Sequence, residues 1–523
     1  CISSDGYIDR ASSSLKSIFL SAAYNGEKSI YRFNIISGKE KTYQAWMGVP
    51  KDSLETRRTY NPYTYENETD NYQQDHYQFF YTRELNRSWL LNAALFYVRG
   101  SGYYEQFKED RGFASYGLED IITGGDTISA TDLVQQKWLD NHFYGLTWSA
   151  HYKQKKIDLI IGGGGNKYIG DHFGKIIWAQ YAANMEKDHR WYFNDGIKTD
   201  LNLYAKANYQ ATEKINLYGD MQYRIINYRI HGIHDDLRNI SQEHDFNFFN
   251  PKLGMVYTVS DRQEAYFTFG MANREPNRSA YRDALPGEEP TYETLYDYEL
   301  GYKYTASRLT ASANIFYMDY SNQLVHTGKI NNVGTPIMTN VKDSYRTGIE
   351  LQANIRLAKR LHWSLNASFS RNKIKDFIAY VDNWNYWDDP DNEPLQYADT
   401  LGETDISFSP AIVAGSLLDY EPLKDLHISL ASNYVGKQYV DNTSSDERSL
   451  DPWFLNDIRF MYTIRTELVK EISIHLQVNN IFSVEYESNA WIYRYIYNGQ
   501  EGVMDGYFPQ APTNFFVGLG IKL

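Results

Sequence analysis

Apolar and polar residues alternate along most of this chain. The segment SYRTGIELQANIRL (344–357) places Ile349 and Leu351 on one face and Glu350 and Gln352 on the other. Successive side chains of a β-strand point to opposite faces, so this period of two predicts a strand with one apolar and one polar face. The same alternation recurs at 201–210, 214–225, 361–370 and 515–523. We therefore predict an all-β chain of antiparallel strands.

The connections between the predicted strands alternate between short and long. Short polar turns are predicted at Glu213-Lys214, Ser307-Arg308 and Lys359-Arg360. They join the strand pairs 200–212 with 214–230, 293–308 with 309–325, and 344–360 with 361–377. Long loops are predicted near 100–136, 167–199, 231–248, 326–343, 378–404 and 489–510. Short turns at one rim and long loops at the other are typical of outer-membrane barrels.

The length of the predicted strands separates the possible architectures. We expect about 19 strands of roughly 10 to 17 residues, whereas strands of globular proteins average about 5 to 6. About 9 to 11 tilted residues cross a bilayer. A soluble β-sandwich or β-propeller would have shorter strands and no reason to place its long loops at one end. We predict a transmembrane antiparallel β-barrel with its apolar face against outer-membrane lipid.

The composition supports this architecture and limits the partners. The chain of 523 residues has 47 Tyr, 25 Phe and 11 Trp but only 14 Pro, a balance that suits pleated strands. Mean hydropathy is −0.58, and no run approaches the roughly 18 apolar residues of a membrane helix. The net charge of −14 repels phosphate backbones, so we expect no nucleic-acid partner. The single cysteine, Cys1, excludes an internal disulfide; a lipid-bearing mature terminus is an alternative interpretation of it.

The last predicted strand bears on how much of a barrel this sequence holds. If the short turns lie at the periplasmic rim, Leu523 lies there too, and about 19 strands place residue 1 at the opposite rim. Single-chain bacterial barrels have even strand numbers, so we expect strands to be missing. Three more would make about 22, a size whose lumen is normally plugged. We interpret residues 1–523 as one barrel domain, the C-terminal part of a longer protein.

Several strands carry the sequence signatures of a known family. They are ETLYDYELGYKY (293–304), IFYMDYSNQL (315–324), DSYRTGIELQANIRL (343–357), LQVNNIFSVEYES (476–488) and the terminal FFVGLGIKL. This ordered set resembles the barrel of TonB-dependent outer-membrane receptors, and DGYIDRASSSLKSIFLSAAY (5–24) is similar to the first third of the barrel in iron-type receptors. The style of these segments resembles receptors of the Bacteroidetes. The sequence departs from the family in lacking a plug domain and a TonB-contacting segment, and in having Leu523 for the usual terminal aromatic residue.

The resemblance implies an outer-membrane receptor that imports a scarce, bulky ligand. The TonB–ExbB–ExbD complex would energise it through the missing N-terminal region, and the C-terminus would be periplasmic. A ferric siderophore is the ligand expected first, with cobalamin or haem as alternatives, and no cofactor is implied. A passive channel or structural barrel is the alternative from another class. A barrel enzyme is the third, although the sequence has no GxSxG, HExxH or paired-carboxylate signature.

Two predicted loops carry the aromatic residues that would contact such a ligand. Aromatic rings can stack on a catecholate or a macrocycle, and an arginine can pair with an anionic chelate. The candidates are Trp384, Tyr386 and Trp387 in loop 378–404, and Trp491, Tyr493, Arg494 and Tyr495 in loop 489–510. The alternative interpretation is an aromatic girdle or packing within the loops.

The basic segment NREPNRSAYRD (273–283) supplies three further candidates, Arg274, Arg278 and Arg282. They would suit an anionic siderophore, and the alternative is a solvated loop with internal ion pairs. The segment lies where haem receptors carry their loop motif, but it does not match their FRAP and NPNL boxes, which disfavours haem.

One further loop has residue types that bind transition metals. The segment IHGIHDDLRNISQEHD (230–245) contains three histidines and several carboxylates. Their spacing matches no defined site, so we assign no metal there and expect a polar loop.

Overall fold

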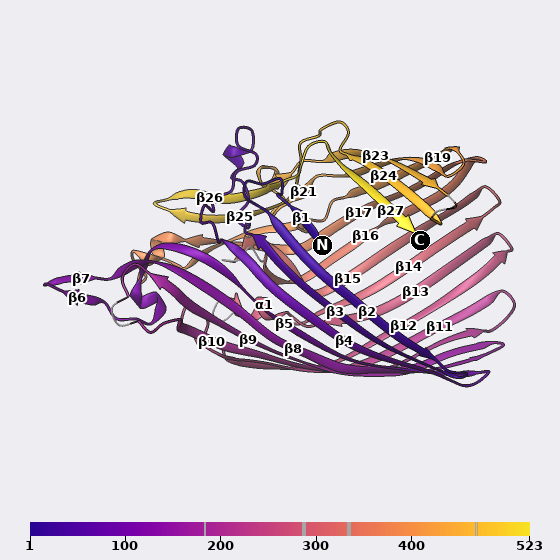
Figure 1. The fold of residues 1–523 in the computed structure, drawn as a ribbon, viewed down its shortest axis with the longest axis horizontal. Coiled ribbons are helices and arrows are strands. Elements are labelled where there is room, and N and C mark those ends of the chain that lie inside the picture. Colours follow the sequence, from indigo (N-terminus) through magenta and orange to yellow (C-terminus); the bar gives the residue numbers. More distant parts are fainter. Residues whose placement is uncertain (183–184, 285–288, 332–335, 466, 468, 523) are drawn as a thin grey trace. The chain divides into compact units, whose positions relative to one another are not determined.

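The computed structural model describes residues 1–182, 185–284, 289–331, 336–465, 467 and 469–522. Among these residues, 23 strands pair in one large sheet that is antiparallel apart from a short contact between β17 and β25 (Figure 1). The predicted all-β fold class is therefore confirmed. None of the described helices is long and apolar enough to cross a membrane. Leu523, on which the expected position of the C-terminus depends, lies outside the described residues.

The elements have the following bounds. The strands are β1 (Ile2–Ser4), β2 (Ser13–Asn25), β3 (Ser29–Tyr43), β4 (Thr69–Asn86), β5 (Trp89–Gly112), β6 (Ile121–Thr123), β7 (Asp126–Ile128), β8 (Ala130–Gln154), β9 (Ile157–Ala179), β10 (His189–Gln210), β11 (Ile215–Gly232), β12 (Gln242–Ser260), β13 (Gln263–Arg274), β14 (Glu293–Thr305), β15 (Leu309–Ile330), β16 (Pro336–Ala358), β17 (Leu361–Asn383), β18 (Gln396–Asp405), β19 (Ile412–Leu423), β20 (Leu426–Val435), β21 (Gln438–Tyr439), β22 (Ser449–Leu450), β23 (Trp453–Ile464), β24 (Glu471–Asn479), β25 (Glu487–Tyr497), β26 (Gln500–Pro509) and β27 (Asn514–Lys522). The helices are α1 (Arg278–Arg282) and the 3₁₀ helices η1 (Lys51–Ser53), η2 (Phe113–Tyr116), η3 (Trp384–Trp387) and η4 (Asp446–Arg448).

The chain forms two compact units. Unit 1 comprises residues 1–47, 60–209 and 218–251, and unit 2 comprises residues 48–59, 210–217 and 252–523. In unit 1, β2 to β5 and then β8 to β10 pair in chain order, each strand antiparallel to the next (Figure 1).

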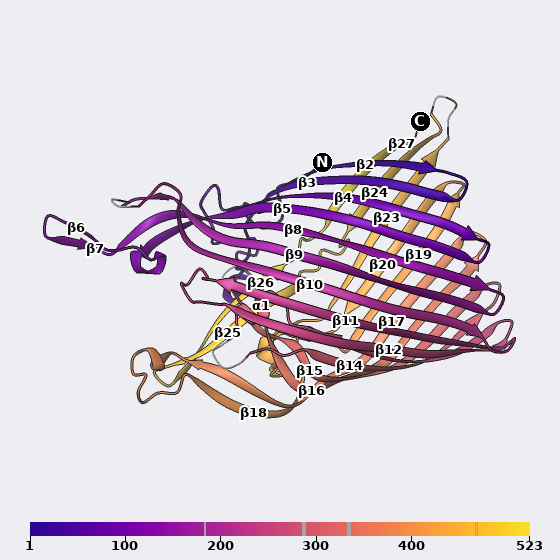
Figure 2. The same ribbon diagram turned by 90° about the horizontal axis from the view of Figure 1, so that it is seen from below.

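In unit 2, the strands β13 to β17 also pair in chain order, and the pairing continues through β19, β20, β23, β24 and β27. We call these consecutively paired strands the wall. Two segments are inserted between wall strands that pair directly. β18 folds back on the far part of β17, and the β25–β26 hairpin lies between β24 and β27 in sequence. In Figure 2, β18 and β25 extend past the ends of the wall strands.

The predicted short turns are confirmed. β10 and β11 are joined by residues 211–214, β14 and β15 by 306–308, and β16 and β17 by 359–360. The apolar positions of these strands share one face that is exposed, as Ile315, Ile349 and Phe369 show by their exposed fractions of 44–52%. Large apolar side chains are exposed in this pattern where a wall faces lipid.

The expected extent of several loops was wrong. Residues 100–112 and 130–136 continue β5 and β8, so these strands reach 24 and 25 residues and exceed the predicted 17. The same holds for 167–199, where β9 and β10 occupy most of the predicted loop. These segments carry many polar residues between their apolar ones, and the backbone of each pairs with its neighbour. Leu133, Ile176 and Trp191 from three of these strands also pack in one buried apolar cluster. The helix η1 lies in the long connection 44–68, which was not predicted as a loop.

A buried chain of polar side chains holds part of this connection in unit 1. Gln135 Nε2 donates to Gln106 Oε1 at 3.2 Å, and Gln106 Nε2 donates to Gln44 Oε1 at 3.1 Å. Glu68 is 2% exposed, and its Oε2 accepts from the backbone N–H of Phe107 at 3.2 Å. Burial raises the pKa of Glu68 to about 7, since a carboxylate loses hydration there.

Candidate functional site

The two predicted aromatic loops meet in unit 2 at the end of β17. The side chain of Asn383 caps η3 by accepting from the backbone N–H of Asn385 at 3.2 Å, which turns the chain at Trp384. Beside it, β25 pairs in parallel with the last residues of β17, placing Asp382 opposite Tyr495. This long-range pairing brings residues 384 and 493–495 together.

Three aromatic residues form what we call the aromatic shelf: Trp384, Tyr493 and Tyr495. The Trp384 ring stacks on Tyr495 with centroids 3.8 Å apart and planes at 13°. Trp384 Nε1 donates to the Tyr493 hydroxyl oxygen at 2.9 Å, and the two tyrosine rings lie 6.1 Å apart at 24°. The three side chains are half-buried. The hydrogen bond and the stack together fix the orientation of all three rings.

A cation and a carboxylate border the aromatic shelf. Lys329, at the end of β15 away from the short turns, places its ammonium 5.1 Å from the centre of the Tyr493 ring. Lys329 Nζ also lies 3.2 Å from Asp382 Oδ1, which accepts from Gln396 Nε2 at 2.7 Å. β25 lies outside the wall, and burial, reinforced by the neighbouring Asp382 carboxylate, raises the pKa of Tyr493 to about 12. The phenol therefore stays neutral at physiological pH.

The other predicted residues of these loops lie elsewhere. Tyr386 and Trp387 pack edge to face at 5.4 Å, and Trp387 is 74% exposed. Trp491 is only 6% exposed, on a strand whose neighbours Ala490 and Ile492 belong to a buried apolar cluster. Arg494 Nε donates to Glu501 Oε1 at 2.6 Å across the β25–β26 hairpin. Of the seven loop candidates, the structure therefore brings three together as one surface.

The three predicted arginines form a separate group in unit 2. Arg274 ends β13 and pairs with Glu293 at 2.8 Å, and Arg282 binds both carboxylate oxygens of Asp283 at 2.6 and 2.7 Å. Arg278 is the first residue of α1, whose cap is the Asn277 side chain. Internal ion pairs, which the sequence left as an alternative, are present for Arg274 and Arg282. They hold the segment in place.

The arginine group and the aromatic shelf are connected through β15. Asn331 Nδ2 donates to Asp283 Oδ2 at 3.0 Å, and Asn331 follows Lys329 by two residues. Sequence reasoning missed Lys329 and Gln396 because neither lies in an aromatic or basic run. Their positions follow from the pairing of β15, β17 and β18, which no local pattern encodes.

The histidine-rich loop of unit 1 forms an ion-pair cluster. His234 Nε2 lies 2.9 Å from Asp235 Oδ1, Lys137 Nζ binds the other Asp235 oxygen, and Trp191 Nε1 donates to the Asp235 carbonyl at 3.1 Å. These partners outweigh burial and hold the pKa of Asp235 well below its usual range. His234, Asp235 and Asp236 lie close enough to share an ion.

The carboxylates of that cluster already face protein cations. Asp235 is paired with Lys137, and Asp236 Oδ2 accepts from Arg238 Nε at 2.6 Å. His231 is 79% exposed and pairs with Asp195 instead. A metal ion would have to displace these partners, so the group is better explained as a set of ion pairs that holds loop 233–241 in place.

The aromatic shelf can bind a ligand with flat π faces and negative charge. Trp384 and Tyr495 offer ring surface, and Lys329 lies at its border, paired with Asp382.

Comparisons with known proteins agree with the architecture. The family described as "TonB dependent receptor-like, beta-barrel" matches residues 21–481. The ferripyoverdine receptor of Pseudomonas aeruginosa is 24% identical over 315 residues, which cover 58% of this chain and 34% of that receptor. The chain thus spans about a third of the length of this curated relative.

Solved structures show the same fold. The ferric yersiniabactin uptake receptor FyuA from Yersinia pestis is 14% identical, with a TM-score of 0.66 over 97% of this chain and 70% of that one. The siderophore receptor PiuA from Acinetobacter baumannii is 11% identical, with a TM-score of 0.70 over 97% of this chain and 74% of that one. Because the family match covers most of the sequence, this chain belongs to the TonB-dependent receptor-like β-barrel family, whose members are transport receptors of the outer membrane.

Proposed function

We propose that this chain is the barrel of an outer-membrane receptor that takes up a ferric siderophore. The observation that carries the proposal is the aromatic shelf with Lys329 at its border. A ferric catecholate is flat at each ring, which suits the ring surface of the aromatic shelf, and its negative charge would compete with Asp382 for Lys329. The arginine group is connected to the aromatic shelf through Asn331, and an anionic ligand would compete with Glu293 for Arg274.

The remaining parts of the transport machinery belong to the same proposal. We expect the long loops to face the outside and the short turns and the C-terminus to face the periplasm. Import would be energised by TonB with ExbB and ExbD, through a segment outside residues 1–523. The relatives named above are a ferripyoverdine receptor, a ferric yersiniabactin uptake receptor and a siderophore receptor, and this supports the choice of ligand over cobalamin or haem.

Binding measurements on the complete native receptor in detergent test the ligand. A ferric tris-catecholate, ferric citrate, haem and cobalamin are each titrated by calorimetry. We expect saturable binding of a ferric siderophore and weaker or absent binding of the other two classes. Tighter binding of cobalamin or haem would reject the ligand assignment.

Uptake assays and conductance separate a receptor from a channel. We expect iron accumulation from the bound siderophore to require TonB, and purified protein in planar bilayers to show no steady conductance. TonB-independent uptake with a stable open conductance would support the passive-channel alternative instead.

A further inference from the structure

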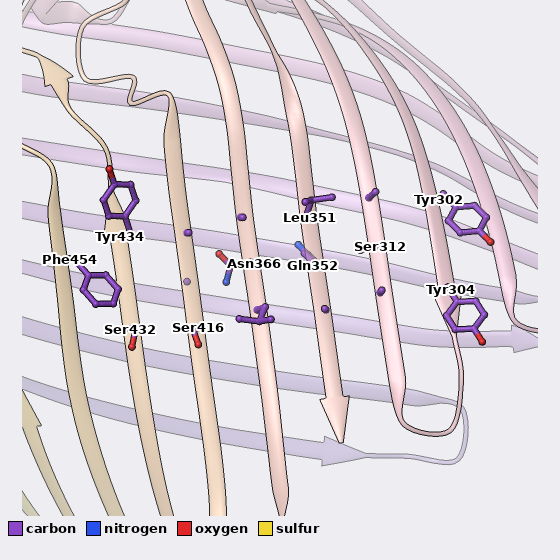
Figure 3. Close-up of a pocket in the computed structure, with 17 residues that line it drawn as sticks. Tyr302, Tyr304, Ser312, Leu351, Gln352, Asn366, Ser416, Ser432, Tyr434 and Phe454 are labelled. Atoms are coloured by element: carbon purple, nitrogen blue, oxygen red, sulfur yellow. The ribbon is translucent and has the colours of Figure 1, made fainter. Parts of the chain in front are cut away.

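The apolar face of unit 2 carries a groove that the ligand site does not use. The groove has a volume of about 750 Å³ and crosses the strands from β14 to β23 (Figure 3). Tyr302 and Tyr304 stand at one end, and Tyr434 and Phe454 stand at the other (Figure 3). Most of its floor is small: Ala311, Ala313, Ala353, Ala367, Ala414, Ser416 and Ser432.

The strand register creates the groove between two ridges. The floor consists of the paired rows Ala313–Leu351–Ala367–Ala414 and Ala311–Ala353–Leu365–Ser416. The adjoining rows on the same face are Ile315–Ile349–Phe369–Ile412 on one side and Leu309–Ile355–Trp363–Leu418 on the other. Side chains two positions apart share a face, so bulky rows enclose a floor dominated by alanine.

The floor of the groove is mostly hydrocarbon, and its two serine hydroxyls are hydrogen-bonded to neighbouring side chains. Trp363 Nε1 donates to Ser416 Oγ at 2.9 Å, and Ser432 Oγ donates to Asn456 Oδ1 at 2.6 Å. A polar ligand group therefore gains little from these two hydroxyls. An alkyl chain in the groove is stabilised because its apolar surface is removed from water and makes van der Waals contacts with the floor.

The distance between the groove and the short turns increases from β15 to β20. Ala311 lies two residues after the start of β15, and Tyr434 lies eight residues after the start of β20. At about 3.3 Å per residue, these positions are roughly 7 Å and 26 Å from their turns along the strands. A strand tilt of about 35–45° makes the heights roughly 5 Å and 20 Å. The rise of about 15 Å matches one leaflet of a hydrocarbon core about 30 Å thick.

Positive charge gathers at the low end of the groove. Arg308 lies in the β14–β15 turn, and Lys359 and Arg360 lie in the β16–β17 turn; all three are exposed. None of them forms an ion pair with a described residue, and Arg360 Nη1 donates to the carbonyl of Pro422 at 3.2 Å. In the next turn, the Asp425 carboxylate is occupied by Arg465 at 2.7 Å.

We propose that this groove binds one anionic phospholipid from the leaflet at the short-turn end of the wall. One acyl chain lies on the alanine floor between the two ridges, and the phosphate lies among Arg308, Lys359 and Arg360. The slope of the groove and the position of the charges agree with a lipid whose headgroup lies at the membrane surface and whose acyl chain reaches the middle of the membrane. The proposal rests on the lipid-facing wall and is independent of which ligand is transported.

Native mass spectrometry of the complete receptor, with added phosphatidylglycerol or phosphatidylcholine, tests the chain and the headgroup. We expect one retained phosphatidylglycerol and about tenfold weaker retention of phosphatidylcholine. Ala353→Phe with Ala367→Phe fills the floor and should lower phosphatidylglycerol retention about tenfold. Ile315→Phe with Ile349→Phe, in the adjoining ridge, is the matched control and should leave it unchanged.

A second pair of variants tests the charges. Lys359→Gln with Arg360→Gln should reduce phosphatidylglycerol retention to the phosphatidylcholine level, while Lys155→Gln with Lys156→Gln in the β8–β9 turn should not. Heat-modified migration in gels shows that each variant is folded. Equal retention of both lipids, insensitivity to the filled floor, or a retained second copy of the chain in place of lipid would each overturn the proposal.

Discussion

Replacement of Trp384 by alanine is the most direct perturbation of the aromatic shelf. The change removes a ring stacked at 3.8 Å on Tyr495 and a hydrogen bond of 2.9 Å to Tyr493. An aromatic pair contributes about 0.5–1.5 kcal/mol and a hydrogen bond about 1 kcal/mol. If ligand binding depends on the oriented rings, the loss of about 1.5–2.5 kcal/mol weakens affinity by roughly 10- to 60-fold.

Calorimetric titration of the ferric siderophore measures this loss, since removal of a tryptophan does not disturb the signal. Trp384→Phe keeps a stacking ring but loses the indole donor, so an intermediate loss of roughly fivefold is expected. Trp387→Ala is the matched control, because Trp387 lies in the same η3 helix but is 74% exposed and touches Tyr386. Equal losses for the two alanine variants, or full affinity in Trp384→Ala, would refute the placement of the ligand on the aromatic shelf.

Three further outcomes follow from the structure. Burial raises the pKa of Glu68 from 4.5 to about 7, so the packed conformation of residues 60–68 is most stable below about pH 4.5 and loses this stabilisation as the pH rises through about 7. Amide hydrogen exchange of residues 60–68 should therefore increase with pH more steeply than the intrinsic exchange rate does. Glu68→Gln should remove this extra pH dependence. Gly301→Ala places a Cβ 2.1 Å from a tyrosine ring carbon and should cost about 1–3 kcal/mol in thermal unfolding, whereas Gly270→Ala, with its first contact at 3.6 Å, should be tolerated. Asp235→Asn leaves its largely buried lysine partner Lys137 without an ion pair and should expose loop 233–241 to proteolysis at a cost of up to about 3 kcal/mol, while the more exposed Asp236→Asn should change cleavage little.

The sequence predicted the wall well because its information is local. Alternation at 344–357 and the turn at Lys359-Arg360 arise from neighbouring residues, and β16 and β17 lie where these patterns place them. The ends of the long strands were underestimated since the extensions of β5 and β8 are mostly polar in sequence; their few apolar side chains, such as Leu133, are buried in the structure. Such segments become strands only because each finds the other as a pairing partner.

The candidate site was predicted in part. Trp384, Tyr493 and Tyr495 were chosen as aromatic loop residues, and the structure places them in contact. Trp387 and Trp491 have the same residue type and equally aromatic surroundings, yet one is exposed and the other is buried. Local composition cannot distinguish these outcomes, because burial depends on the segment that packs against each ring.

By itself, the sequence determined the β class, the alternation of short turns and longer connections, the lipid-facing set of apolar residues and the family. These properties depend on the period of two and on motifs within single strands, so they can be predicted without knowing which strands pair with each other. Only the tertiary structure decided which residues meet across strands. The parallel contact of Asp382 with Tyr495 assembles the aromatic shelf, and the register of β15 with β16 aligns Ala311 with Ala353 in the floor of the groove. Pairing partners and register are set by backbone hydrogen bonds between segments far apart in the chain, and a shift of one residue would turn each of these side chains to the opposite face.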